Sequence, residues 1–275
     1  MRHRDPAPAR RTSAHVCESP SPAEIVFGTH PVRELLEARL REVERVYVLR
    51  ERSKALGRIL RSAREAGVPV SYVDRQAFAR KLGARVVHQG IAAVVTPVPY
   101  AEADEVARRA VAEAAGLVVL VDRVEDAGNL GAIVRTAAAA GASGVLLCVE
   151  GTTGLSAGVA RASAGAVERI PVAREPRPTW RIARLREAGF RSIVLDPRGE
   201  VAWDGLDLKG PLVVVAGGEA RGPRPGIRDA CEFRAAIPLA AGIESLNVAV
   251  ATGVLLFEAV RQRRRPSLAN PGPGC

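Results

Sequence analysis

Short apolar strands that alternate with helices constrain the fold of this chain more than any other feature of its sequence. Apolar runs of strand length recur in the second half at residues 117–121, 144–149, 191–195 and 211–216. Apolar residues at helical spacing predict helices at residues 130–140, 155–164, 179–188 and 246–263. Strands that alternate with helices pair in parallel and carry the helices on their faces, so we expect an α/β domain with a mainly parallel sheet.

The first half of the chain predicts a smaller α/β domain at residues 24–96. Strand patterns at residues 43–49, 68–73 and 88–95 alternate with helical patterns at residues 30–40, 55–66 and 75–82. Pro97 and Pro99 then mark a linker, which continues into a helix and occupies residues 97–115, ahead of a second domain at residues 116–265. Residues 1–23 and 266–275 have no folding pattern, so we expect a disordered basic arm and a disordered tail.

The net charge of the chain favours a nucleic-acid partner. Lysine and arginine total 40 against 30 aspartates and glutamates, which gives a formal net charge of +10. Such a surplus attracts polyanions, because it neutralises phosphates and releases their counterions. We expect the outer faces of the first domain to carry many of these charges, at Arg33, Arg39, Arg41, Arg45, Arg50, Arg52, Arg58, Arg61 and Arg64.

The composition disfavours membrane proteins and zinc or disulfide scaffolds. No apolar run approaches the roughly 18 residues that span a bilayer, so we expect no membrane partner. The cysteines, Cys17, Cys148, Cys231 and Cys275, are scattered without a CxxC pair, which argues against a zinc site and against a disulfide framework. We therefore expect a cytoplasmic protein that holds no metal.

Three polar or glycine-rich clusters lie where we expect ligands to bind in an α/β sheet, outside the carboxyl ends of its strands. The first, residues 122–135, runs into a helix that Asn129 is able to cap through its side-chain oxygen. Arg135 lies in an otherwise apolar stretch, so we expect a buried guanidinium that needs an anionic partner. Either an RNA phosphate or the carboxylate of Glu219 would serve.

The second and third clusters lie further along the chain. In residues 215–222, the tandem Gly217 and Gly218 permit close approach of a ligand to the backbone. A P-loop is excluded, because Pro223 and Arg224 stand where lysine and serine or threonine are required. In residues 237–253, an irregular loop precedes a helix that Ser245 is able to cap, and Gly253 permits close approach to that helix.

Together these clusters resemble the signature of the SpoU (TrmH-type) RNA ribose 2′-O-methyltransferases. The matching segments are Asn129 to Arg135, Gly217 to Glu219, Ile237 with Pro238, and Ser245 to Val248. Residues 161–168 also resemble a family segment, and residues 24–97 resemble the family's substrate-binding domain, which is similar to ribosomal protein L30e. The resemblance covers residues 24–264. The sequence departs from the common pattern of this family at Ala220, Pro223, Pro225 and Ala249.

The resemblance implies an L30e-like N-terminal RNA-binding domain and a SPOUT-type α/β trefoil-knot catalytic domain that works as a homodimer. It implies S-adenosyl-L-methionine as the cofactor, with Gly217, Ile237 and Leu246 at cofactor-contact positions. The catalytic and substrate positions fall on Asn129, Arg135, Glu219, Ser245 and Asn247. The layout is most similar to members that methylate a guanosine ribose in bacterial 23S ribosomal RNA.

Several alternatives stay open on the sequence alone. Arg135 acts either as a base, its proton affinity lowered by desolvation, or as a clamp on a neighbouring phosphate while water or phosphate accepts the proton. The substrate is either 23S ribosomal RNA, a transfer RNA, or an antibiotic-resistance site in ribosomal RNA. A non-catalytic RNA-binding protein on the same scaffold is the alternative from another class, and it predicts loss of Arg135 or Asn247, which are both present.

Overall fold

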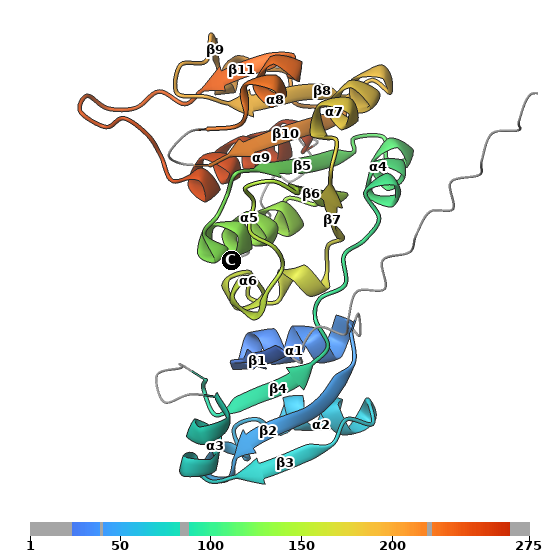
Figure 1. Ribbon diagram of the computed structural model, residues 1–275, viewed down its shortest axis with the longest axis vertical. Coiled ribbons are helices and arrows are strands. Elements are labelled where there is room, and N and C mark those ends of the chain that lie inside the picture. Colours follow the sequence, from blue (N-terminus) through green and yellow to red (C-terminus); the bar gives the residue numbers. More distant parts are fainter. Residues whose placement is uncertain (1–23, 39–40, 83–87, 219–221, 265–275) are drawn as a thin grey trace, which may run out of the picture.

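The computed structural model describes residues 24–38, 41–82, 88–218 and 222–264 (Figure 1). The predicted basic arm at 1–23 and the predicted tail at 266–275 lie outside the described residues, as does Glu219. Within the described part, the strands form one four-stranded and one seven-stranded sheet, each with its own helices.

The smaller sheet belongs to the N-terminal domain. Its strands, in spatial order, are β1 (Glu24–Phe27), β4 (Ile91–Val95), β2 (Val43–Leu49) and β3 (Val70–Val73). Its helices are α1 (Thr29–Ala38), α2 (Gly57–Glu65) and α3 (Arg75–Leu82). Leu35 of α1 and Leu60 of α2 pack with Val46 in the main core, and Phe78 of α3 packs with Leu49 and Ala92 in a smaller cluster.

The larger sheet is parallel throughout. Its strands, in spatial order, are β7 (Val172–Glu175), β6 (Gly144–Cys148), β5 (Leu117–Asp122), β10 (Leu212–Gly217), β8 (Arg191–Leu195), β11 (Phe233–Ala236) and β9 (Val201–Ala202). Every residue of β5 and β6 is buried, which explains their continuous apolar sequences, because parallel strands are covered on both faces. Since β5 and β10 are central and adjacent, the loops that follow them meet at one edge of the sheet.

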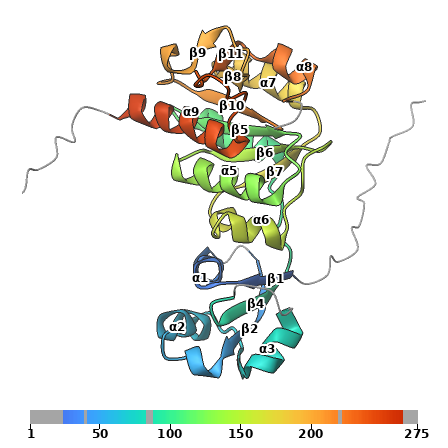
Figure 2. The same cartoon turned by 90° about the vertical axis from the view of Figure 1, so that its left-hand side faces the viewer.

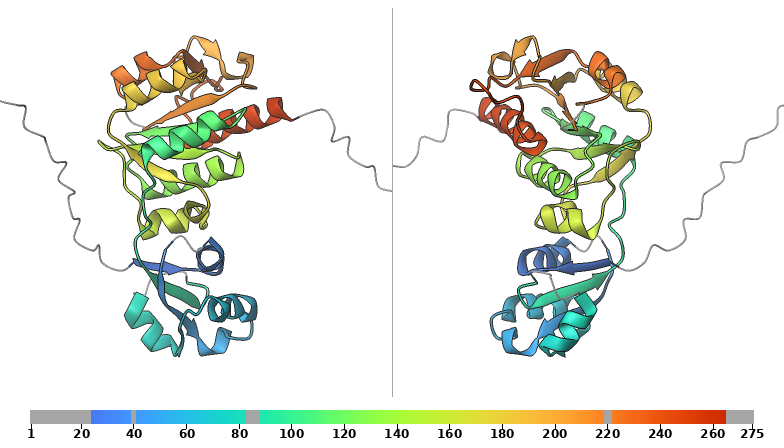
Figure 3. Two further views of the ribbon diagram at one scale, coloured as in Figure 1. Left: turned by 90° about the vertical axis from the view of Figure 1, so that its right-hand side faces the viewer. Right: turned by 60° about the vertical axis from the view of Figure 1, so that its left-hand side comes forward.

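Helices cover both faces of this sheet (Figures 1 and 3). One core cluster joins the sheet to α5 (Ala127–Ala139), α6 (Ala157–Ala162) and α9 (Val248–Arg263). The other joins it to α4 (Ala103–Ala112), α7 (Pro178–Glu187) and α8 (Pro225–Ala230). Short 3-10 helices add η1 (Arg50–Arg52), η2 (Ala166–Glu168) and η3 (Trp203–Gly205).

The predicted α/β fold with a parallel sheet is confirmed, but the sequence patterns missed β7, β9 and β11. These strands have two to four residues, and β7 and β11 include the charged Arg174, Glu175 and Arg234. Their apolar runs are therefore too short for periodicity to separate them from loops.

The two domains stack end to end, with α1 and β1 facing α6 and η2 (Figure 2). The linker rises along one side of the molecule from β4 to α4 (Figure 3). Most described arginines of the first domain are exposed, as predicted, but Arg41 is not. Its side chain is 1% exposed and lies between the domains, so its predicted place on an outer face is wrong.

A test of the catalytic-domain packing is Gly131→Ala. Helices α5 and α6 touch at Gly131, where an added Cβ would lie 2.4 Å from the Cβ of Ala162 and 2.8 Å from the backbone nitrogen of Ser163. We expect the substitution to lower the free energy of unfolding by about 1–3 kcal/mol, as overpacking does. Gly57→Ala in α2 is the control, because a Cβ there meets nothing within 4 Å. Equal melting temperatures for the two variants would contradict this account.

Candidate active site

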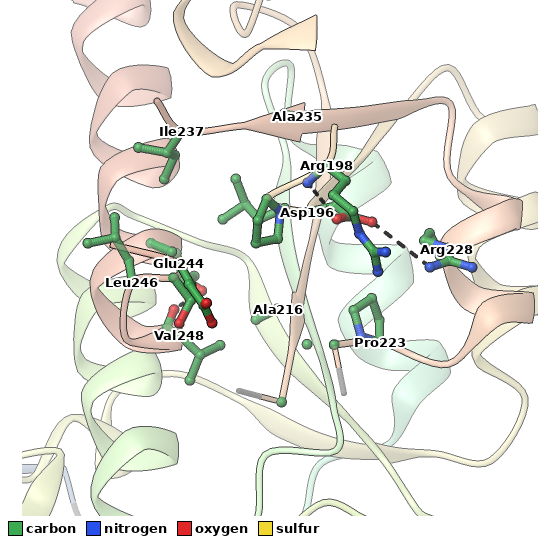
Figure 4. Close-up of a pocket in the computed structure, with 18 of the residues that line it drawn as sticks. Asp196, Arg198, Ala216, Pro223, Arg228, Ala235, Ile237, Glu244, Leu246 and Val248 are labelled. Carbon is green, nitrogen blue, oxygen red and sulfur yellow. Dashed lines mark hydrogen bonds and ion pairs between the residues drawn. The ribbon is translucent and has the colours of Figure 1, made fainter. Parts of the chain in front are cut away.

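A cavity of about 760 Å³ opens where β8, β10 and β11 end (Figure 4). Its lining residues come mainly from three segments: Leu195 to Arg198, Ala216 to Gly218 with Gly222 and Pro223, and parts of Ile237 to Thr252. Arg228 of α8 and Ala235 of β11 complete the lining. This is the edge at which α/β sheets bind ligands, and the volume is in the range of small-molecule sites, about 300–1,000 Å³. The cavity is therefore the candidate ligand site of the catalytic domain.

Tight backbone packing shapes the loop that follows β10. A Cβ on Gly217 would lie 2.2 Å from the Cδ of Pro223, and one on Gly218 would lie 2.0 Å from the carbonyl oxygen of Arg123. Neither position accepts a side chain without movement of the backbone. The tandem glycines thus let the loop fold back on itself and leave its backbone at the cavity wall.

A buried ion pair holds the far end of this loop. Asp122, the last residue of β5, is fully buried, and its Oδ1 lies 2.8 Å from Nη2 of Arg224 in an ion pair and accepts a hydrogen bond from Nε at 3.0 Å. Its Oδ2 accepts one from the backbone nitrogen of Arg224 at 2.7 Å, and its carbonyl oxygen accepts one from the nitrogen of Gly218 at 2.9 Å. Asp122 therefore fixes both ends of the glycine loop.

Asp196 and Arg228 form the polar side of the cavity, opposite Leu246 and Glu244 (Figure 4). Asp196 accepts a hydrogen bond from the backbone nitrogen of Arg198 at 2.9 Å and faces Nη1 of Arg228 at 4.0 Å. Sequence reasoning missed this pair and also the role of Asp122. The available signal was a carboxylate at the end of an apolar run, at Asp122 after Leu117 to Val121 and again at Asp196 after Ile193 to Leu195.

The structure brings several sequence-predicted residues to this cavity. Gly217, Ile237 and Leu246, the predicted cofactor contacts, all line it, and so does Ser245. Next to it, Nδ2 of Asn247 donates a hydrogen bond to Oδ1 of Asn129 at 2.8 Å, which joins the first turn of α5 to the start of α9. Segments more than a hundred residues apart thus meet in one place.

Two predicted helix caps are wrong. Asp126 caps α5, and its Oδ1 accepts a hydrogen bond from the backbone nitrogen of Asn129 at 2.7 Å. Asn247 caps α9 by accepting from the nitrogens of Ala249 and Val250. Each helix follows a residue whose side chain accepts hydrogen bonds from free N–H groups. Helix α5 starts earlier than the sequence predicted, and helix α9 starts later. The side chains of Asn129 and Ser245 therefore do not cap these two helices.

Arg135 does not line this cavity, and the prediction that it is buried is wrong. It is exposed on α5, whose buried face is formed by Leu130, Ile133, Val134 and Ala137. The many alanines of this helix made it look apolar on all sides. Arg135 lines a second cavity, of about 610 Å³, together with His30 and Glu34 of α1 and with Arg169. Among the described residues it has no ion pair, so its guanidinium is available to an anion.

The titratable groups near the site do not form a metal centre. Within the described ranges, no three histidine, cysteine, aspartate or glutamate side chains come together as metal ligands. Burial raises the pKa of the Cys148 thiol to about 12, and the charge of Asp122 adds to the effect, so this thiol stays protonated at neutral pH.

None of the helices in the described part is long and apolar enough to cross a membrane.

Asp122→Asn tests the clamp on the glycine loop. Breaking a buried ion pair by removing one partner costs about 3–5 kcal/mol, so we expect a lower free energy of unfolding by that order. We also expect faster hydrogen exchange at the amide of Arg224. The control is Glu150→Gln, which removes the 83%-exposed second partner of Arg224 and should change stability by less than about 1 kcal/mol. If both variants unfold alike, Asp122 does not hold the loop.

Two family models match the chain. That of the SpoU rRNA methylase family matches residues 116–257, and that of the RNA 2′-O ribose methyltransferase substrate-binding domain matches residues 25–101. The first range contains all the residues that line the cavity of about 760 Å³, and the second contains the four-stranded sheet except Glu24.

Individual relatives extend over most of the chain. A protein of Mycobacterium avium named uncharacterized tRNA/rRNA methyltransferase is 38% identical over 259 residues, 94% of this chain and 82% of its own. The SpoU methyltransferase AviRb of Streptomyces viridochromogenes, solved in complex with the cofactor AdoMet, aligns with a TM-score of 0.73 at 28% identity, covering 88% of this chain and 90% of its own. An AdoMet-bound rRNA methyltransferase of Sinorhizobium meliloti gives 0.72 at 28% identity, with 88% of each chain covered. As its motifs predicted, the chain belongs to the SpoU rRNA methylase family, whose members are methyltransferases that act on RNA.

Proposed function

We propose that this protein transfers the methyl group of S-adenosylmethionine to a ribose 2′-hydroxyl of ribosomal RNA, at a guanosine of 23S RNA. The observation that carries the proposal is the convergence of Gly217, Ile237 and Leu246 on one cavity at the carboxyl edge of the sheet. The AdoMet complexes of AviRb and of the Sinorhizobium meliloti enzyme support the choice of cofactor.

The cavity at the ends of β8, β10 and β11 suits a cofactor with an adenosyl group and an amino-acid tail. Its wall combines apolar side chains, such as Ala216, Ile237 and Leu246, with backbone around Gly217 and the polar side chains of Glu244 and Ser245. Such a mixture is typical of small-molecule sites, where a few polar groups fix the orientation. When bound there, S-adenosylmethionine would supply a methyl group on a positively charged sulfur, ready for attack by an oxygen nucleophile.

The chain's own residues then position the ribose and assist its deprotonation. Holding both reactants in attack geometry lowers the barrier by as much as about 7–11 kcal/mol. Arg135 is exposed, so the desolvation on which a base role depends is absent in the single chain. Its free guanidinium favours the other version, a bidentate clamp on a phosphate beside the target ribose. The linked amides of Asn129 and Asn247 would orient the sugar next to the cofactor site.

Labelled transfer tests the substrate. The protein is incubated with S-adenosylmethionine carrying a deuterated methyl group and with transcripts of 23S RNA, 16S RNA or transfer RNA. We expect a labelled 2′-O-methylguanosine in 23S RNA by mass spectrometry of nucleosides, and the same modification to be lost from cells that lack the protein. Label in transfer RNA alone would favour the alternative that the relatives' name, tRNA/rRNA methyltransferase, leaves open. Label on a base would contradict ribose methylation.

Arg135→Ala and Arg135→Lys test the clamp. Removing a preorganised donor of this kind lowers kcat by about 10²–10³-fold, and lysine does not reproduce the two parallel bonds of a guanidinium. We expect both variants to keep their affinity for S-adenosylhomocysteine, because Arg135 lies outside the cofactor cavity. Arg109→Ala, in the same smaller cavity but paired with Glu113, should retain kcat. Full activity of Arg135→Lys would refute a bidentate clamp.

We further propose that the protein is a homodimer through α9. Val250 and Phe257 are 54% and 47% exposed and lie seven residues apart, so they share one face of the helix with half-buried Val254 between them. A self-complementary apolar stripe of this kind is typical of a subunit interface. Gly253 is not part of it, because its Cβ position faces Thr136 of α5 in the same chain at 3.4 Å.

Phe257→Glu tests the dimer. A charge on the apolar stripe should give a monomer in sedimentation velocity and lower the methylation rate. Val111→Glu, at an equally exposed valine of α4 on the opposite side of the sheet, should remain a dimer. A monomeric, fully active wild-type protein would contradict this part of the proposal.

The trefoil knot that the resemblance implies is also part of the proposal. It is supported by the strand order, because β10 lies between β5 and β8, while the chain continues from β10 to β11 beyond β8. A crystal structure that traces residues 217–248 without threading would contradict it.

A further inference from the structure

The segment from Arg161 to Arg169 joins the two domains. Residues 161–168 of this segment resemble a family segment, yet the segment lines no part of the proposed cofactor cavity at the carboxyl edge of the larger sheet. The guanidinium of Arg161 lies 4.8 Å from the ring centre of Phe27 in β1. Arg169 forms ion pairs with Glu34 and, at 3.1 Å, with Glu37, both on α1. The segment is therefore a docking surface for β1 and α1, and we call it the interdomain joint.

The joint is closely packed at its centre. Gly165 has a φ of +88°, and a Cβ there would lie 2.5 Å from the Cβ of Glu34. Only a glycine satisfies both constraints, because the left-handed conformation and the close contact each disfavour a side chain. The backbone of the catalytic domain thus directly contacts helix α1 of the other domain.

A buried ion pair lies beside this contact. Nη2 of Arg41 is 2.7 Å from Oε1 of Glu168, with the two side chains 1% and 2% exposed. Nη1 of Arg41 donates hydrogen bonds to Oε2 of Glu24 and to the carbonyl oxygen of Thr96, each at 3.1 Å. One guanidinium therefore links β1, the start of the linker and the catalytic domain.

The pair is costly to bury, which makes each partner depend on the other. Burial raises the pKa of the Glu168 carboxyl, and the charge of Arg41 opposes that effect. Among the described residues, Nε and Nη2 of Arg41 and Oε2 of Glu168 have no partner in hydrogen-bond geometry, so the contact of Nη2 with Oε1 of Glu168 is an ion pair without a hydrogen bond. Removing one member of such a pair leaves an uncompensated charge in the interior. Loss of either partner alone therefore destabilises the arrangement in which the two domains are packed together at this point.

The joint adjoins the cavity that contains Arg135. His30 and Glu34 of α1 line that cavity together with Arg135 and Arg169. A rotation of the N-terminal domain about the joint would move α1 relative to the guanidinium of Arg135. We propose that Arg41 and Glu168 are positioning residues, which hold the substrate-binding domain so that RNA bound to it meets Arg135 in a single register. This inference rests on the proposed function.

Glu168→Gln tests the proposal, with Glu37→Gln as the matched control. Both substitutions remove a carboxylate that pairs across the joint, but Glu37 is 48% exposed and Glu168 is buried. Misplacement of a substrate by about 1 Å costs up to about 100-fold in rate, so we expect kcat/KM for RNA to fall at least about tenfold in Glu168→Gln. Its affinity for S-adenosylhomocysteine should stay within about twofold of wild type. Glu37→Gln should match wild type in both measurements.

Small-angle X-ray scattering of the same full-length proteins, at one oligomeric state, adds a readout that is independent of activity. We expect a broader distribution of interdomain distances for Glu168→Gln than for Glu37→Gln. Arg41→Lys, which keeps the charge but not all three contacts, should show a milder form of each effect. It also provides the test if Glu168→Gln does not fold.

Two results would overturn the positioning role. One is RNA kinetics and scattering for Glu168→Gln that equal those of Glu37→Gln. The other is a loss of S-adenosylhomocysteine binding, which would place the damage inside the catalytic domain. If the wild-type protein methylates no RNA, the proposed function fails, while the scattering comparison still decides whether the pair fixes the domains.

Discussion

Parallel pairing of β5, β10 and β8 determines where the candidate active site of this protein forms. Because these strands run in one direction, the loops that follow them end at one edge of the sheet, although they are distant in the sequence. The buried carboxylate of Asp122 then fixes the loop after β10 through two hydrogen bonds and an ion-pair contact with Arg224. The cavity next to that loop therefore has a preformed wall, made of backbone at Gly217 and of side chains at Ile237 and Leu246.

The second cavity adds a different chemical environment. This cavity lies between the domains and is lined by Arg135 of α5, whereas the candidate ligand cavity at the carboxyl edge of the sheet is bordered by the start of α9. The hydrogen bond between Asn129 and Asn247 joins these two helices at their first turns. The packing of α5 against α9 thus sets the separation between the proposed methyl donor and the proposed phosphate clamp, and in our proposal the Arg41–Glu168 pair sets the approach of the RNA.

The sequence patterns predicted the long central strands, whose continuous apolar runs are distinctive, and placed polar clusters at the carboxyl edge of the sheet. The second and third clusters line one cavity, whereas Arg135 of the first cluster lines another. Periodicity could not show the exposure of Arg135, since the alanines around it have no strong preference for either side of a helix. It also could not show the burial of Arg41, whose partner Glu168 lies in the other domain. The strands β7 and β11 were missed for a related reason, because a strand of four residues with charged members is stabilised by its neighbours and not by its own pattern.

The placement of the methyl donor is the central claim, and a crystal structure of the protein with S-adenosylhomocysteine tests it most directly. The account predicts density for the nucleoside in the cavity bounded by Ala216, Ile237 and Leu246, with its adenosyl group against the backbone of Gly217. Density in the interdomain cavity beside Arg135, or an absence of binding at saturating concentration, would contradict it.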